Sequence, residues 1–269
     1  MLIFVRHITR YAYAEPVRYA IQVLRLTPPS FLGQRVVDWR VRVAGAGPAL
    51  PFRDGFGNHV QLITINALHQ ALSVEAVGSV ETMDRNGVVE GLDEPSPARV
   101  YLRETPHTRP EAPIRELAGS VAVGDSLGRL HALAAAVRDA VDHVPGTTDA
   151  HTSAAQALAD GKGVCQDHAH IFIAAARSLG IPARYVTGYL LLDPPRQDLA
   201  HHAWAEAWVE SLGWVGFDVA NRICPTERYV RLAAGLDASF AAPITGTRRG
   251  GSTESLDVSV LVEQQQSQQ

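Results

Sequence analysis

The sequence predicts an α+β protein, in which a cysteine-bearing helix packs on a largely antiparallel sheet after a small, β-sandwich-like domain. Three observations support this fold class. Short alternating segments separated by regular turns fill residues 1–83. An apolar stripe with helical spacing follows Cys165, and two alternating segments that can form a hairpin come after it. A chain of 269 residues is long enough for one large core or two smaller ones.

The composition narrows the class of protein. With 46% hydrophobic and 19% charged residues, the chain resembles a soluble globular protein. Its net charge of -4 is small, which argues against a nucleic acid as the partner. The N-terminal segment is too short and polar for a secretory signal, and no apolar run approaches the length of a membrane span. We therefore expect a cytoplasmic protein with no membrane or nucleic-acid partner; nothing in the sequence indicates an oligomeric state.

The N-terminal part, residues 1–83, is predicted to be a β-rich domain. Four segments favour strands because apolar residues alternate and turn residues separate them. These segments cover residues 19–26, 36–43, 59–65 and 72–80, with a turn at residues 54–58. Residues 84–113 contain several prolines and are predicted to be a connector with little regular structure.

Residues 114–262 are predicted to form the core, and residues 263–269 a polar, disordered tail. Asp125 is a suitable N-cap for an amphipathic helix that extends to Val141. A short helix is expected at residues 154–159, after Ser153. It leads into a glycine-bracketed loop and then to Cys165.

Cys165 is predicted to lie in the first turn of a buried helix. The residues after it carry an apolar stripe at helical spacing, formed by Ala169, Phe172, Ile173 and Ala176. Gly180 and Pro182 end this helix. Unpaired N–H groups and the positive end of the helix dipole meet at such a position. This environment favours the thiolate, which is the nucleophilic form of cysteine.

Three strands are expected after this helix. Residues 183–192 form the first, followed by a surface loop at residues 194–198. Residues 201–209 alternate strictly, so His202, Trp204, Glu206 and Trp208 share one face of a strand. Residues 214–219 form the third strand, with Asp218 near its end. If the last two strands form a hairpin, His202 and Asp218 become neighbours.

Four blocks of sequence resemble the bacterial transglutaminase-like family. They are Gly163–His170, Gly180–Tyr189, His202–Glu206 and Gly213–Asp218, and the segments Tyr11–Pro16 and Asp54–Asn58 resemble the family's N-terminal β domain. The resemblance implies a papain-like core with a Cys-His-Asp triad. Matched by motif, Cys165 is the nucleophile, His202 the base and Asp218 the group that orients the base. The family commonly continues Asp-Pro-Thr, whereas this chain continues Asp218-Val-Ala-Asn221, a departure expected to alter the rim of the cleft.

Several residues compete for these roles. His201 should point to the opposite face from His202. His168 and His170 suggest a metal site, but residues two apart on a helix do not face each other, and no zinc-binding spacing is present. We therefore expect no metal and no cofactor. Cys224 is expected to be structural, although a bridge to Cys165 stays open.

Two further side chains on the His202 face have open roles. Trp204 and Trp208 are expected to be part of the core or of the cleft wall. Glu206 is either a hydrogen-bond partner of the triad or a solvated strand carboxylate.

The predicted reaction is acyl transfer from an amide through a thioester on Cys165. His202 would protonate the leaving amine and then activate the acceptor, while Asp218 fixes the imidazole tautomer. The backbone N–H of Cys165 would be one oxyanion donor. Hydrolysis of a peptide or amide is the preferred interpretation; transfer to an amine and a non-catalytic peptide-binding scaffold stay open.

Overall fold

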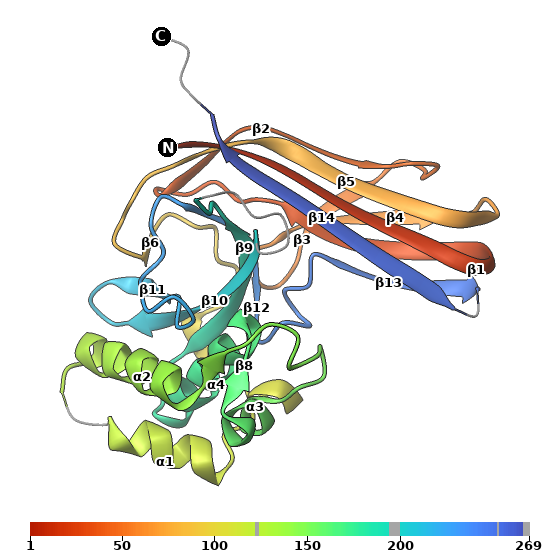
Figure 1. Ribbon diagram of the computed structural model, residues 1–269. Coiled ribbons are helices and arrows are strands. Elements are labelled where there is room, and N and C mark those ends of the chain that lie inside the picture. The colour runs from red at the N-terminus through yellow and green to blue at the C-terminus, as the bar shows by residue number, and fades with distance from the viewer. Residues whose placement is uncertain (122–123, 194–199, 252, 266–269) are drawn as a thin grey trace.

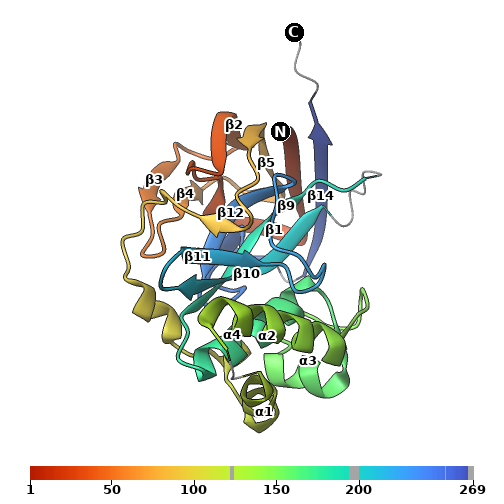
Figure 2. The same ribbon diagram turned by 90° about the vertical axis from the view of Figure 1, so that its left-hand side faces the viewer.

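The computed structural model describes residues 1–121, 124–193, 200–251 and 253–265. It contains a long seven-stranded sheet, a smaller five-stranded sheet and a group of helices. In Figure 1 the five-stranded sheet lies between the helices and the seven-stranded sheet, and Figure 2 shows the same arrangement from the side. The start of the chain and the end of the last described strand lie at the same end of the large sheet (Figure 1).

The long strand β1 (Leu2–Thr27) is the centre of the seven-stranded sheet. Its first half pairs with β5 (His69–Thr82) and β14 (Glu254–Gln264), and its second half pairs with β4 (His59–Ile65) and β13 (Ile244–Gly250). The remaining strands, β2 (Gln34–Val43) and β3 (Leu50–Arg53), pair with β5 and β4. Alternate residues of β1, such as Ile3 and Val5, are buried.

The five-stranded sheet is antiparallel, in the order β12, β9, β10, β11, β6. These strands span Tyr229–Gly235, Ala183–Leu190, His201–Val209, Gly213–Phe217 and Val88–Val89. Alternate residues of β9 show how one face is covered: Tyr185 packs among the helices, whereas Tyr189 packs with the seven-stranded sheet. The helices and the seven-stranded sheet therefore contact the same face of the five-stranded sheet, at different ends of β9.

The described residues form four helices on that side: α4 lies directly on β10, and the other three pack against α4. They are α1 (Ala112–Ser120), α2 (Ser126–Ala140), α3 (Ala154–Asp160) and α4 (Cys165–Ser178). Phe172, Ile173 and Ala176 of α4 are fully buried in a core that they share with Ala205 and Phe217 of the sheet. The predicted buried helix at Cys165 is confirmed, although its residues from Asp167 to Arg177 are buried on every side and not along one stripe. The Asp125 cap of α2 is confirmed too, since its carboxylate accepts a hydrogen bond from the Gly128 N–H.

The C-terminal strands differ from the sequence-based division. The sequence predicted residues 114–262 as one core, but β13 and β14 belong to the seven-stranded sheet. β14 pairs with β1 from Ile3 opposite Gln264 to Tyr13 opposite Glu254. Alternating apolar residues mark such a strand, but they do not indicate a partner at the other end of the chain. Of the predicted tail, residues 263 and 264 lie in β14 and residues 266–269 lie outside the described part.

The Pro-rich segment 84–113 packs against the core instead of crossing open solvent. Its β6 pairs with β11, and residues Ala98–Leu102 and Pro106–Thr108 form 3₁₀ turns. Tyr101 is only 2% exposed and its ring lies edge-on to Trp214, with centroids 5.1 Å apart. The predicted lack of long elements is confirmed, but the segment is part of the packed structure. The predicted loop 194–198 lies outside the described residues.

Two side-chain amides from the N-terminal part cover the outer edge of β12. Gln34 Nε2 donates to the Arg231 carbonyl at 2.8 Å, and its Oε1 accepts from the Arg231 N–H at 2.7 Å. Asn58 bonds Ala234 in the same way, at 2.8 Å in both directions. Because β12 is an edge strand, these amides satisfy backbone groups that would otherwise be buried without partners.

Candidate active site

Cys165 is the first residue of α4, and a buried carboxylate fixes the turn before it. Asp167 Oδ2 accepts hydrogen bonds from the Val164 N–H at 2.7 Å and from Thr148 Oγ1 at 2.6 Å. Gly163 leaves room for this carboxylate, because a Cβ there would lie 2.7 Å from the Cβ of Asp167. The thiol is thereby held at the end of the helix where backbone N–H groups have no intrahelical acceptors.

His202 and Asp218 meet as the predicted hairpin requires. β10 and β11 pair with Glu206 opposite Gly216, and Asp218 follows β11 directly. The distance from His202 Nε2 to Asp218 Oδ2 is 2.6 Å, and both side chains are buried. Since Nε2 is engaged by the carboxylate, Nδ1 is the ring nitrogen left for Cys165.

Asp218 has two further donors that the sequence did not indicate. Tyr229 Oη and Asn221 Nδ2 both donate to Asp218 Oδ2 at 2.7 Å, and the Asn221 N–H donates to Oδ1 at 3.2 Å. Burial raises the pKa of Asp218, but the hydrogen bonds from His202, Tyr229 and Asn221 outweigh it, so the pKa lies below its usual value. Asn221 belongs to the segment where the chain departs from the family pattern, and there it binds Asp218 directly.

The pKa of His202 depends on burial and on two neighbours, Asp218 and Cys165. Burial lowers the pKa of His202, but hydrogen bonds with Asp218 and Cys165 and the negative charges of both groups outweigh it. Together they raise this pKa to about 10. The imidazole is therefore held in its protonated form at neutral pH.

His201 lies apart from this site. Its Nε2 is 3.0 Å from Thr187 Oγ1, and its ring centroid is 6.0 Å from that of His7 in β1. The prediction that His201 and His202 point to opposite faces of the strand is thus confirmed.

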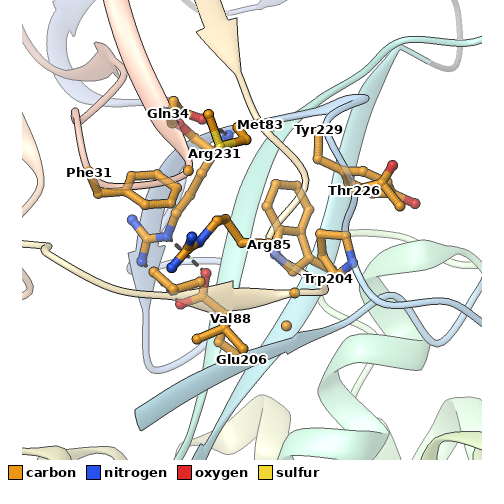
Figure 3. A pocket seen from close by; sticks show the side chains of 15 residues that line it. Phe31, Gln34, Met83, Arg85, Val88, Trp204, Glu206, Thr226, Tyr229 and Arg231 are labelled. Atoms are coloured by element: carbon orange, nitrogen blue, oxygen red, sulfur yellow. Dashed lines mark hydrogen bonds and ion pairs between the residues drawn. The ribbon is translucent and has the colours of Figure 1, made fainter. Parts of the chain in front are cut away.

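Trp204 and Tyr229 form a wall beside the pair. The Trp204 ring stacks on His202 with centroids 6.4 Å apart, and it meets Tyr229 edge-on at 5.5 Å. Gly188 lies opposite His202 on β9, and a Cβ there would come within 2.7 Å of the Trp204 ring. Behind the wall is a cavity of about 50 Å³, which Phe31, Met83, Arg85 and Arg231 also line (Figure 3). Trp204 thus has the predicted role of a wall residue.

Glu206 has neither of the roles that the sequence suggested. It is fully buried and accepts hydrogen bonds from Arg184 Nε at 2.6 Å and Arg231 Nε at 2.9 Å (the latter pair is visible in Figure 3). Arg184 in turn lies over the Trp214 ring, 3.9 Å from its centroid. Burial raises the pKa of Glu206, but the two arginines outweigh it and lower this pKa to about 2. The network stabilises the sheet beneath the site.

The remaining candidates lie elsewhere. His168 contacts the carbonyl oxygens of Val164 at 2.8 Å and Val141 at 3.0 Å, while His170 Nε2 accepts from the Ala238 N–H at 3.1 Å. Over the described ranges, no group of three or more His, Cys, Asp or Glu side chains is arranged to hold a metal ion. Both cysteines are free thiols.

Comparison with known proteins identifies the family. Residues 115–219 match the transglutaminase-like superfamily, and residues 3–81 match the bacterial transglutaminase-like N-terminal region. The chain is 34% identical to protein ML0607 of Mycobacterium leprae over 281 positions, which cover 95% of this chain and 96% of that protein. It is 30% identical to Rv2569c of Mycobacterium tuberculosis over 297 positions, which cover 96% and 91%.

One solved structure is similar over nearly the whole chain. It is a candidate cysteine protease from Cytophaga hutchinsonii, with a TM-score of 0.73, 22% identity and coverage of 96% of this chain and 90% of that chain. This likeness confirms the α+β fold with a papain-like core. The protein described here belongs to the transglutaminase-like superfamily and carries the N-terminal region typical of its bacterial members. In the described part of the chain, no helix is both long and apolar enough to cross a membrane.

Proposed function

We propose that this protein catalyses cysteine-dependent acyl transfer on an amide bond, and that water is the usual acceptor. One observation carries the proposal: Cys165 begins α4 beside His202, whose second ring nitrogen lies 2.6 Å from the buried carboxylate of Asp218. A nucleophile, a base and a group that orients the base are the three parts of a triad.

In the first step, the Cys165 thiolate attacks the amide carbonyl, and a bond forms between Sγ and the carbonyl carbon. The oxyanion accepts hydrogen bonds from backbone N–H groups at the start of α4. The His202 imidazolium gives its proton to the leaving amine, and the C–N bond breaks to leave a thioester. Asp218 holds the ring and its tautomer throughout.

In the second step, His202 takes a proton from water as the water oxygen attacks the thioester. The C–S bond breaks, the carboxylic acid leaves, and the thiolate–imidazolium pair is restored. We favour water over an amine because a protein-cross-linking enzyme would be hazardous in the predicted cytoplasmic location. The description of the Cytophaga hutchinsonii protein as a candidate cysteine protease supports the same choice of reaction.

The test uses intact-mass spectrometry with a panel of peptide amides and activated esters as acyl donors. Each donor is offered alone, with a primary amine, and with hydroxylamine, which converts a thioester to a hydroxamate. We expect a mass increase on Cys165 that decays mainly to the free acid, even with the amine present. Dominant transfer to the amine would make the protein a transglutaminase, and no Cys165 adduct with any donor would support a binding scaffold.

A matched pair of variants makes the assignment specific, because the described residues contain a second free thiol. Cys165→Ala should abolish adduct formation and turnover, whereas Cys224→Ala should retain both. Iodoacetamide at neutral pH should label Cys165 before Cys224, whose pKa is raised by burial and then by the charge of Asp84. Labelling of Cys224 first would contradict the assignment of the nucleophile.

A further inference from the structure

The carboxylate of Asp218 makes more contacts than a triad requires. A single oxygen, Oδ2, accepts from His202 Nε2 at 2.6 Å, Tyr229 Oη at 2.7 Å and Asn221 Nδ2 at 2.7 Å. The side chain of Asp218 is fully buried, so these donors take the place of water. They come from three different segments: β10, β12 and the turn after β11.

We propose that Tyr229 and Asn221 are positioning residues that share the negative charge of Asp218 with His202 and so control how firmly the imidazole holds its proton. This inference rests on the function proposed above. If His202 were its only donor, the carboxylate would form a stronger charge-assisted hydrogen bond with Nε2–H and would stabilise the imidazolium more. An imidazolium that holds its proton too firmly is a poor acid toward the leaving amine.

The geometry supports separate roles for the two residues. Asn221 bonds both carboxylate oxygens, through its backbone N–H and its side-chain amide, so it fixes the rotation of the carboxylate. Tyr229 approaches from β12, the edge strand of the same sheet, and its ring meets Trp204 edge-on. The pKa of Tyr229 is raised far above its usual value, first by burial and then by the charge of Asp218. Its hydroxyl therefore keeps its proton and remains a donor at every pH of interest.

The other charged or titratable groups around the pair are few. Cys165 faces His202 from α4, and His143 of β7 (Asp142–His143) lies near both His202 and Asp218. His201 is the adjacent residue on β10, and Arg228 lies near Tyr229. None of these donates a hydrogen bond to Asp218 among the described contacts. Tyr229 and Asn221 are therefore the donors through which the charge of the carboxylate can be adjusted.

The test measures the alkylation of Cys165 by iodoacetate across neutral and alkaline pH, in a Cys224→Ala background. Sγ bonds to the methylene carbon and iodide leaves, so the reaction needs no substrate. Because iodoacetate is an anion, the reaction is faster while His202 carries its proton, and the rate falls as that proton is lost. The alkaline limb of the profile therefore reports the imidazolium directly.

We expect Tyr229→Phe to move this limb to higher pH by about 0.5–1 unit. With one donor fewer, the negative charge of Asp218 stabilises the His202 imidazolium more strongly. Asn221→Ala should move it in the same direction, and the double variant should move it further than either. Tyr189→Phe is the matched control, because it removes another buried hydroxyl, one that bonds His7, and should leave the limb in place. Asn221 is exposed, so its variant is expected to fold even if Tyr229→Phe does not.

The outcomes separate this inference from the proposed function. If the wild-type limb is present, is lost in His202→Ala and is unmoved in both Tyr229→Phe and Asn221→Ala, the two residues only pack against the site and the inference is wrong. A shift to lower pH in folded variants would equally overturn charge sharing. If the wild type has no limb that depends on His202, the triad itself is wrong and both proposals fall.

Discussion

At the scale of single residues, His202 and Asp218 should dominate the chemistry. His202→Ala removes the base and the acid together, so we expect the largest loss in kcat among the variants of this pair. Asp218→Asn keeps the shape but loses the charge that supports the imidazolium, and a loss of roughly 10²–10⁴-fold is expected. His201→Ala should be mild, because its ring bonds Thr187 away from the site. Steady-state kinetics with an acyl donor that the mass-spectrometric panel identifies measures this order.

The order itself is the critical result. If a folded His201→Ala variant lost as much activity as His202→Ala, the base would have to be reassigned. Circular dichroism of each variant serves as the folding control, since His202 and Asp218 are buried.

A second residue-scale prediction concerns the buried carboxylate of Glu206. Glu206→Gln keeps the size of the side chain but leaves Arg231 without its counter-charge and Arg184 with only the partly exposed Glu94. Breaking a buried ion pair in this way costs roughly 3–5 kcal/mol of unfolding free energy. Glu75→Gln is the control, because its pair with Arg6 is partly exposed and should cost below about 1 kcal/mol. Urea unfolding at neutral pH measures both variants.

The same carboxylate has a predictable pH dependence. Its folded pKa of about 2 lies below the ordinary value of 4.5, so its stabilising contribution is complete above pH 4.5 and is lost as the pH falls toward 2. The wild type should therefore lose part of its advantage over Glu206→Gln in this range. A constant difference between the two proteins down to pH 2 would show that the fold does not lower the pKa of this carboxylate.

The sequence revealed some of these residues and not others, for physical reasons. Cys165, His202 and Asp218 could be found because a helix start, a strict alternation and a short hairpin are local patterns. Tyr229 could not, because its hydroxyl reaches Asp218 only through the register of β12 on β9 and of β9 on β10. The role of Glu206 was predicted wrongly for the same reason, because its partners Arg184 and Arg231 lie on β9 and β12.

At the scale of elements, the outer edge of β12 should depend on the amides of Gln34 and Asn58. Each amide uses both its oxygen and its nitrogen on one residue of the strand, and each is 3% exposed. Replacing either by alanine leaves a buried N–H and a buried carbonyl unpaired, at a cost of roughly 1–3 kcal/mol for each group. Thermal and urea unfolding of Gln34→Ala and Asn58→Ala should show this loss.

Gln70→Ala provides the control, because Gln70 is an exposed amide in β5 of the seven-stranded sheet and its loss should change stability little. If Gln34→Ala and Asn58→Ala were as stable as Gln70→Ala, the edge of β12 would be satisfied by other groups. This contact also explains a limit of the sequence prediction. The strands themselves were visible from alternation, but an amide that replaces a strand partner has no periodic signature.

At the scale of the whole molecule, the N-terminal part and the transglutaminase-like part share a core. Apolar residues of β1, β5 and β14 pack with Tyr189, Val230 and Leu232 of the five-stranded sheet. The first strand and the last described strand, β1 and β14, belong to the same sheet, and the Gln265 N–H bonds the Leu2 carbonyl at 2.9 Å. The boundary predicted at residue 83 rests on the order of elements along the chain. The core, in contrast, combines strands that are far apart in the sequence, so it crosses that boundary.

This shared core contains a buried histidine that should make the fold sensitive to acid. His7 is 3% exposed, with Nδ1 2.9 Å from Tyr189 Oη and Nε2 3.1 Å from Thr9 Oγ1. Burial, and to a lesser extent the charge of His201, lowers the pKa of His7 to about 3. The folded protein therefore keeps this ring neutral under conditions in which the unfolded chain would protonate it.

Between the ordinary histidine pKa of 6.5 and about 3, the unfolded state binds one more proton than the folded state at this position. The unfolding free energy should then fall by about 1.4 kcal/mol for each unit that the pH drops, from His7 alone. His7→Gln retains a polar side chain but removes the titration, so its stability should decline less steeply by that amount. In urea unfolding between pH 6 and pH 4.5, the difference in slope between the two proteins isolates the effect, because Glu206 contributes only below pH 4.5 and the lowered pKa values of His170 and His201 act in both proteins. Equal slopes for the two proteins would mean that His7 takes up its proton in the folded state, and that the contact between the two sheets tolerates a charge.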